Sequence, residues 1–336
     1  MQLNKKFIVT MVLCLVGISF LFGGGAKEAK KEAGPSYRLL VGMVVTEKDP
    51  MFKGAMELKK NVEARTGGKI QIEVYPSSQL GDTKDMQEQV KAGANIAVIT
   101  DAARLAESVP AVGILGAPYI VDNFEQGRKL VTSALFKGWT EELAEKHGYR
   151  VLSFNWYQGA RHFLTNKPIK TPEDLKGLRI RTPGATVWQE TIRAMGASPT
   201  ALAWAEVYPG IQQKVIDGAE AQFPAVVGAR LYEVIKYITK TGHFQLITPL
   251  VCSETWFKKL PKEYQDILLE EALKAGDHAS KLTIDGLAEN EAFMKAQGVT
   301  ISEVDITPFK RACDTVYDKI QGYRALKQQV EQVLAK

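Results

Sequence analysis

From Tyr37 onward, short stretches with the two-residue period of a β-strand alternate with longer stretches that have the period of an α-helix. The first helix-like stretch opens at Pro50, a residue suited to a first helical turn, and ends at Gly67 and Gly68. The predicted elements are a strand at 37–45, a helix from Pro50, a strand at 70–75, a helix at 82–92 and a strand at 94–100. This β-α-β-α-β order predicts a mostly parallel sheet that helices cover on both faces.

The alternation resumes later in the chain, with strand-like residues at 149–156 and 178–183. A long helical section is predicted at about 261–297, and a last helix runs from about Thr307 towards the C-terminus. Two α/β lobes favour a hinged binding protein. This inference rests on architecture alone, because one fold can host many functions.

Residues 1–25 have the three-part layout of a secretory signal, with two lysines ahead of an apolar run and small residues after it. The alternative is a retained membrane anchor. The run Phe7–Phe22 has 16 residues, whereas about 20 are needed to span a bilayer comfortably. We therefore expect cleavage near Gly25 and Ala26, a polar spacer at 26–36 and a periplasmic mature protein.

The composition is that of an ordinary folded protein, with 45% hydrophobic and 24% charged residues. It excludes a disordered, collagen-like or coiled-coil chain as a whole, and 336 residues suggest roughly two domains. The formal net charge is +5, of which two positive charges lie in the predicted leader, so the rest carries +5 − 2 = +3. Charges of both signs are mixed along the chain, which disfavours nucleic-acid binding.

The sequence contains no recognisable catalytic or metal-binding motif. Its four histidines lie far apart and lack the spacing of metal ligands. The segment 64–70 superficially resembles a phosphate-binding loop, but it lacks the leading glycine and the Ser/Thr after Lys69. No GxSxG nucleophile motif occurs. We therefore expect no catalytic residue, no metal site and no cofactor.

Two cysteines, Cys252 and Cys313, remain once the leader is removed. Two thiols cannot form a disulfide framework, and a chain of this size does not need one. The sequence leaves one disulfide and two buried free thiols as open alternatives, because it does not give the distance between the two residues.

The most informative segment is 161–183. Residues 171–174 open a short helix in capping style, and Gly177 ends it. Residues 178–181 then form a strand whose two arginines face the same side. The guanidinium of Arg181, at the end of this strand, could enter an interlobe cleft and pair with a carboxylate through two parallel hydrogen bonds. An exposed arginine at a strand end is the simpler alternative.

Five ordered segments, spread over about Tyr37 to residue 320, resemble one family. They are IQIEVYPSSQLGD (70–82), DMQEQVKAG (85–93), APYIVDN (117–123), TPEDLKGLRIRTP (171–183) and EVYPGIQQKVIDGAEAQ (206–222). Together they are similar to the solute-binding proteins of tripartite ATP-independent periplasmic (TRAP) transporters, of the dicarboxylate-binding (DctP-like) type. The most specific match is the segment 171–183.

The resemblance implies roles for individual residues. Arg181 matches the family's carboxylate-clamping arginine, and Arg161 matches a second arginine ahead of its "N-K-P-I" turn. Asp85 falls near an acid that follows "L-G" in the family. The family's last motif ends in an asparagine where this chain has Ala221. That departure puts an amide contact in doubt, unless Gln222 supplies the amide from the next position.

Seven aromatic residues lie in or beside these segments. Each is more often a core residue than a ligand contact, but together they favour a ligand with an apolar or aromatic body, since a small polar diacid would need more donors. Phe163, Trp188 and Tyr208 complete our set of predicted ligand contacts. The seven aromatic residues are Trp156, Tyr157, Phe163, Trp188, Trp204, Tyr208 and Phe223.

The resemblance also implies an α/β, two-lobed periplasmic-binding-protein fold with a hinge and a long helix that spans the lobes. By analogy, lobe I comprises 36–158 plus 247–285, and lobe II comprises 159–246 plus 286–330. A carboxylate ligand would lie between the lobes, which close on it. The closed form, expected to be a monomer, would deliver the solute to the small and large integral membrane subunits of a permease without any nucleotide.

Two other functions are kept as alternatives. An exported α/β enzyme could act on an organic acid, although no nucleophile–base motif supports it. A receptor could instead present its ligand to a signalling partner. The sequence does not name the organic acid.

Overall fold

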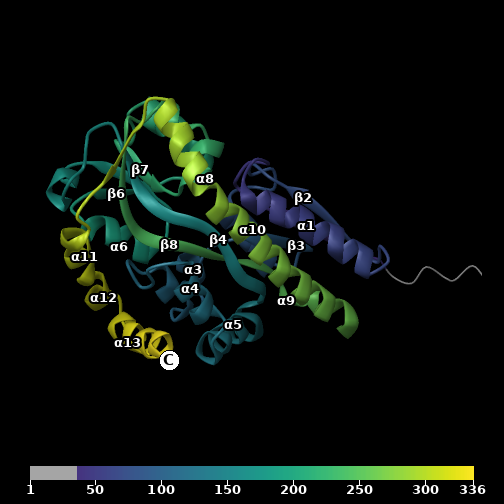
Figure 1. Ribbon diagram of the computed structural model, residues 1–336. Coiled ribbons are helices and arrows are strands. Elements are labelled where there is room, and N and C mark those ends of the chain that lie inside the picture. Colours follow the sequence, from purple (N-terminus) through teal and green to yellow (C-terminus); the bar gives the residue numbers. More distant parts are fainter. Residues whose placement is uncertain (1–35) are drawn as a thin grey trace, which may run out of the picture. The chain divides into compact units, whose positions relative to one another are not determined.

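A mixed sheet of nine strands runs through residues 36–336, the part of the chain that the structure, a computed structural model, describes (Figure 1). The predicted signal peptide lies outside the described residues, as does the spacer up to residue 35. Eight strands follow the order β2-β1-β3-β8-β4-β7-β5-β6, and β9 pairs with β8. Their bounds are β1 Tyr37–Gly42, β2 Ile70–Tyr75, β3 Ile96–Ile99, β4 Tyr149–Thr165, β5 Arg179–Thr182, β6 Ser198–Ala201, β7 Gly218–Ala221, β8 Tyr237–Ser253 and β9 Thr300–Glu303.

The first part of the sheet follows the prediction. Strand β1 pairs in parallel with β2 and β3, and the connections are helices α1 (Pro50–Arg65) and α2 (Thr83–Lys91). Helix α1 begins at Pro50 because Asp49 caps it, its Oδ1 accepting the backbone N–H of Met51 at 2.9 Å. This β-α-β-α-β unit carries the loops that follow β1, β2 and β3.

Strands β4 and β8 make the sheet mixed, so the predicted mostly parallel arrangement is wrong for its centre. Each has 17 residues, and they pair antiparallel with each other; β3 joins β8 and β7 joins β4 in the same antiparallel sense. Register shifts interrupt the β4–β8 pairing at several points between Val151 and Phe163. Such bulges bend and twist a strand pair. The strand predicted at 149–156 is thus longer than expected and continues through these bulges to Thr165.

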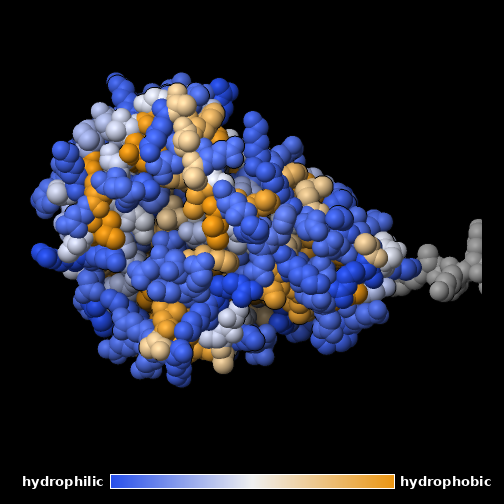
Figure 2. Space-filling view, in the orientation of Figure 1, coloured by the Kyte–Doolittle hydropathy of each residue, from blue (hydrophilic) through white to orange (hydrophobic). Residues whose placement is uncertain are grey.

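Helix α10 (Lys262–Ala296, 35 residues) connects the two parts of the sheet, as predicted for 261–297. It packs against α1 and β4, and also against α8 (Phe223–Gly228) and β9. In Figure 1 it crosses the molecule beside β4. The face in Figure 2 is largely hydrophilic, and within residues 36–336 no helix is both long and apolar enough to cross a bilayer.

The single C-terminal helix predicted from Thr307 is wrong. The chain forms α11 (Thr307–Asp314), α12 (Val316–Lys319) and α13 (Tyr323–Ala335), and Gly322, with φ of 82°, precedes the last of them. Because glycine adopts positive φ at little cost, it turns the chain here. Helix α13 packs on α4 (Phe124–Val131), so the C-terminal segment returns to residues that we had placed in lobe I.

The remaining elements connect strands or cover the sheet. The short helix predicted at residues 171–174 is a single 3₁₀ turn. Further helices are α3 Ala102–Leu105, α5 Ala134–His147, α6 Thr186–Ala194, α7 Val207–Gln212 and α9 Glu254–Phe257, and the 3₁₀ turns are Val112–Gly116, Pro172–Leu175, Trp204–Glu206 and Leu231–Glu233. Cys252 and Cys313 are both buried free thiols in separate core clusters. Of the two alternatives left open, the free thiols are therefore correct, and burial raises the pKa of each.

Gly54 allows α1 and α10 to approach closely. A Cβ at this position would lie 2.7 Å from Cβ of Ala279 and 2.8 Å from Cζ3 of Trp156. Gly54→Ala is therefore expected to destabilise the protein by about 1–3 kcal/mol through overpacking. Gly138→Ala is the matched control, since nothing lies within 4 Å of a Cβ there. It should stabilise helix α5 by roughly 0.5–1 kcal/mol. Thermal denaturation of the two variants checks both signs; equal melting temperatures would contradict this packing.

Candidate functional site

A cavity lies next to the central strands β4 and β8, with walls from both predicted lobes. Residues of predicted lobe I that line it include Val44, Asp82, Thr83, Thr100, Asp101, Arg104, Gln158 and Thr248. Residues of predicted lobe II that line it include Arg161, Arg181, Pro183, Trp188, Trp204, Gln222, Ala225 and Leu246. Most of these side chains are polar or charged, which is unusual for a buried space and marks a site for a polar solute.

Arg181, on β5, is almost fully buried in the wall of this cavity, with 2% of its surface exposed. Its Nε and Nη2 groups donate to the carbonyl oxygen of Leu202 at 3.0 and 2.8 Å, and its guanidinium lies 5.3 Å from the ring centre of Trp204. Nη1 has no acceptor among residues 36–336. Burial, and next the charge of Arg161, lower the pKa of Arg181 to about 9. The cavity therefore holds a cation at an energetic cost.

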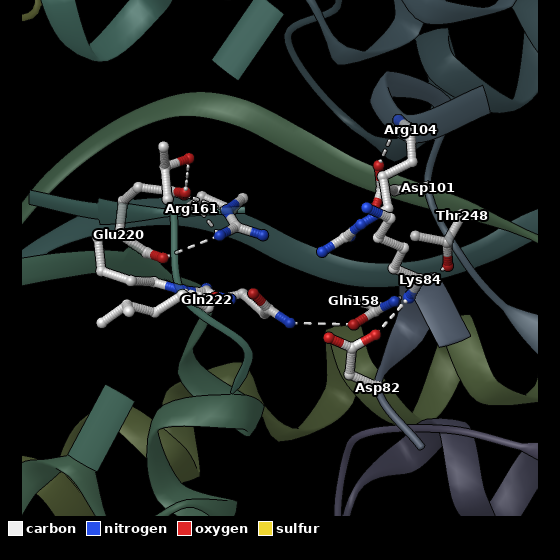
Figure 3. A network of polar contacts seen from close by, with 12 residues as sticks. Asp82, Lys84, Asp101, Arg104, Gln158, Arg161, Glu220, Gln222 and Thr248 are labelled. Carbon is white, nitrogen blue, oxygen red and sulfur yellow. Dashed lines mark hydrogen bonds and ion pairs between the residues drawn. The ribbon is translucent and has the colours of Figure 1, made fainter. Parts of the chain in front are cut away.

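Arg161, on β4, is neutralised by a buried partner. Its Nε and Nη2 groups donate to the two carboxylate oxygens of Glu220, with 2.7 Å for the Nη2 bond (Figure 3). Thr182 Oγ1 donates to the same carboxylate at 2.7 Å. His243 lies 3.9 Å from Glu220, but burial and the charge of Arg161 hold its pKa well below the usual range, so the imidazole is neutral. Two arginines and one glutamate thus leave one positive charge, that of Arg181, without an anionic partner.

The opposite wall consists of residues that cap helices after strands of the parallel unit. Asp82 caps α2, and its Oδ1 accepts from the backbone N–H groups of Lys84 and Asp85 at 2.7 and 3.0 Å. Asp101 caps α3 and forms an ion pair with Arg104 (Figure 3). These charges are therefore satisfied within the protein. Residues 36–336 contain no group of three or more His, Cys, Asp or Glu side chains that could hold a metal ion.

Neutral polar groups complete the lining. Gln222 Nε2 donates to Gln158 Oε1 at 3.0 Å, and Gln158 Nε2 donates to Thr248 Oγ1 at 3.1 Å. Thr100 Oγ1 and Trp188 Nε1 are buried and have no hydrogen-bond partner among the described residues. Buried polar atoms normally have partners, so these two atoms support a polar occupant of the cavity.

Four predicted ligand contacts are brought together by the fold: Arg181, Arg161, Gln222 and Trp188 all line the cavity. The ring of Trp188 lies under the guanidinium of Arg161, 4.9 Å from its central carbon. Of the seven aromatic residues, only Trp188 and Trp204 contribute to the lining, and an arginine occupies one ring face of each.

The other three predicted contacts do not line the cavity. Asp85 Oδ2 accepts the backbone N–H of Asp82 at 3.0 Å, completing the cap of α2. Phe163 stacks on His243 in the core, with ring centres 4.8 Å apart. The hydroxyl of Tyr208, on α7, donates to Glu233 at 3.0 Å. Each of these side chains already has another structural role.

Sequence reasoning did not single out Asp82, Asp101, Arg104, Gln158 or Thr248. For Asp101 a signal was present, because it lies two residues after the end of a buried strand and immediately before a helix. Ligands bind at the carboxyl ends of parallel strands, so this position could have been found. Gln158 and Thr248 lie inside the long strands β4 and β8, where nothing local distinguishes a cavity residue from a core residue.

A family model described as "Bacterial extracellular solute-binding protein, family 7" matches residues 41–322. The chain belongs to this family. It is therefore a binding protein of a transport system and not an enzyme, and its fold is the two-lobed fold of TRAP periplasmic solute-binding proteins. Members of this family bind small molecules and work with membrane permease subunits.

Three known proteins illustrate the similarity. The sialic acid-binding periplasmic protein SiaP of Vibrio cholerae is 29% identical over 84% of this chain and 88% of its own length. A TRAP solute-binding protein of Escherichia fergusonii, in an open structure without ligand, is 43% identical over 89% of this chain and all of its own, with a TM-score of 0.78. One of Actinobacillus succinogenes, with bound L-galactonate, is 30% identical over 88% of this chain and 99% of its own, with a TM-score of 0.85.

Proposed function

We propose that this protein binds an organic acid in the cavity between its lobes, with Arg181 as the main carboxylate-binding residue and Arg161 beside it. The unmatched positive charge of Arg181 is the observation that carries the proposal. A carboxylate that pairs with its free Nη1 would give the buried guanidinium the anionic partner that it lacks. The protein then passes the solute to the small and large integral membrane subunits of a TRAP permease.

A hydroxylated acid suits the lining better than the apolar or aromatic body that the sequence favoured. The two aromatic rings of the lining each have an arginine against one face. Thr100, Gln158, Gln222 and Thr248 instead offer neutral polar groups. Two of the similar proteins described above are associated with hydroxylated acids, sialic acid for the Vibrio cholerae protein and L-galactonate for the Actinobacillus succinogenes protein.

The predicted division into lobe I (36–158 plus 247–285) and lobe II (159–246 plus 286–330) remains a proposal, and the lobes close on the solute. In support, the TM-score is higher for the solute-bound relative, 0.85, than for the open one, 0.78, although the open one shares more sequence. We also keep the proposal that the protein is exported through cleavage near Gly25 and acts as a periplasmic monomer that binds no nucleic acid.

Binding of the acid should depend on pH through Arg181. Below pH about 9 Arg181 carries its charge in the free protein, so the affinity for L-galactonate should be constant. Above that pH, binding must first restore the proton, and the affinity should fall by up to tenfold per pH unit. Calorimetry in buffers of different ionisation enthalpy should show no proton uptake at pH 7.5 and an uptake approaching one proton at pH 10.

The matched control is Arg181→Met, for which proton uptake should stay near zero over the same range. The same measurement can be made with other organic acids, including any acid that mass spectrometry finds bound to the purified protein. Binding of every tested acid without proton uptake at pH 10 would contradict the lowered pKa of Arg181, whereas its role in binding is tested by the affinity of Arg181→Met.

A further inference from the structure

The hydrogen bonds that join Trp156, Thr248, Gln158 and Gln222, here called the amide chain, have only one possible polarity (Figure 3 shows its last three members). The amide chain begins at the backbone carbonyl oxygen of Trp156, which can only accept a hydrogen bond. The hydroxyl of Thr248 lies 2.7 Å away and must give it its single proton. The Thr248 oxygen can then only accept from Gln158, which lies 3.1 Å away.

The same reasoning fixes the next link. The Nε2 group of Gln158 donates its hydrogen bond to Thr248. The other amide atom of Gln158, Oε1, therefore faces Gln222 and lies 3.0 Å from its Nε2. Only Nε2 of Gln222 can donate to that oxygen. The carbonyl oxygen Oε1 of Gln222 is therefore turned away from Gln158, and no donor among residues 36–336 reaches it. The hydrogen-bond network thus determines which atom is nitrogen and which is oxygen in the side-chain amides of Gln158 and Gln222.

Gln222 is thus a fixed acceptor in the wall of the cavity. It lines the cavity and has only 5% of its surface exposed. Its Oε1 is not one of the sealed-off polar atoms such as Thr100 Oγ1, so it faces open space and is available to a donor from the occupant. A flip of the amide would offer a donor instead, but it would break the bond to Gln158.

The pairing of β4 with β7 brings this acceptor to the same end of the strand pair as Arg161. The strands are antiparallel, and His162 is the partner of Ala221. Arg161 and Gln222 are the next residues beyond this pair, and both line the cavity. Nη1 of Arg161, like that of Arg181, has no acceptor among the described residues. A cationic donor and a neutral acceptor thus line the same cavity from the same end of the β4–β7 pair.

We infer that Gln222 selects carboxylates that carry a hydroxyl group on the carbon next to the carboxyl group, that is, 2-hydroxy acids of the aldonate type. The inference rests on the proposed function, in which the arginines hold the carboxylate. The neighbouring hydroxyl then donates to Oε1 of Gln222. A 2-deoxy acid offers no donor to this oxygen. A uronate in its pyranose form places a ring oxygen there, and a ring oxygen cannot donate a hydrogen bond. Gln158 and Thr248 are positioning residues that keep the acceptor in place.

Calorimetry tests the inference. The ligands are two aldonates, L-galactonate and D-gluconate, together with their 2-deoxy analogues and D-glucuronate. The wild-type protein should prefer each hydroxy acid to its deoxy analogue at least tenfold, and should bind D-glucuronate more weakly than the better aldonate. Gln222→Met should bring the hydroxy-to-deoxy ratio close to one. Thr248→Val should also lower this ratio, because Gln158 is then free to turn, whereas Thr248→Ser keeps the hydroxyl and should retain it.

The ratio of affinities is informative because damage to the fold would weaken both members of a pair alike. Equal affinities for hydroxy and deoxy acids in the wild type would overturn the inference, as would the absence of binding by both aldonates. The binding of these acids to Arg181→Met distinguishes an error about Gln222 from an error about the carboxylate site. If this variant loses all the acids while the wild-type ratio is one, only the role of Gln222 is wrong. If it binds them as the wild type does, the proposed carboxylate site is wrong.

Discussion

Replacing Arg181 by methionine is expected to weaken the binding of L-galactonate at least thirtyfold and to leave the protein folded. Removing one partner of a buried, charged hydrogen-bond pair costs about 2–5 kcal/mol, and each 1.4 kcal/mol is about a factor of ten in affinity. Stability should hold or rise, because the variant no longer buries the guanidinium that has lost its water. Calorimetry and thermal denaturation together check the two effects.

Arg181→Lys is the companion variant. Lysine keeps the charge but lacks the planar fork that matches a carboxylate and the second nitrogen that reaches Leu202. It should therefore recover only part of the lost affinity. Wild-type affinity in Arg181→Met would show that another residue binds the carboxylate.

Replacing Arg161 by methionine is expected to damage the fold, and this differs from the effect of changing Arg181. The variant would leave the carboxylate of Glu220, which has no exposed surface, with Thr182 as its remaining hydrogen-bond donor. Breaking a buried ion pair in this way costs about 3–5 kcal/mol. For a protein of this size, the melting temperature should fall on the order of 10 °C.

The matched control removes both charges. Arg161→Met combined with Glu220→Gln leaves no unpaired ion in the core, so it should recover most of the lost stability. Thermal denaturation of the single and double variants measures the coupling. If the single variant has the same melting temperature as the wild type, the Arg161–Glu220 pair does not stabilise the fold.

The accuracy of the sequence prediction varied with how local the determining interactions are. Strand β2 was predicted at 70–75, where alternation is regular and glycine and proline mark the ends. Helix α10 was predicted to within one residue at each end, from the proline just before it and from Ile267, Leu268 and Ala272, which share its buried face. Strand β4 was predicted too short, because most of its residues are buried and its register shifts, so it shows no regular alternation.

The same distinction holds for the site. Arg181 and Arg161 could be proposed because the surrounding segments resemble a family. The pairing of Arg161 with Glu220 could not, since it depends on the register between β4 and β7, which join residues 59 positions apart. Asp85 was proposed because it falls near an acid that follows "L-G" in the family, whereas the acid that lines the cavity is Asp82, its partner in the capping box of α2.

The shared strands β4 and β8 also bear on how a protein of this kind can evolve. Both strands run on from the parallel unit of β1, β2 and β3 to the pairings with β7 and β9. In the proposed division, neither lobe is a contiguous stretch of the gene, and a crossover that exchanged one lobe would have to cut both strands. New solute preferences are more readily acquired by point substitutions in the cavity wall than by recombination of domains.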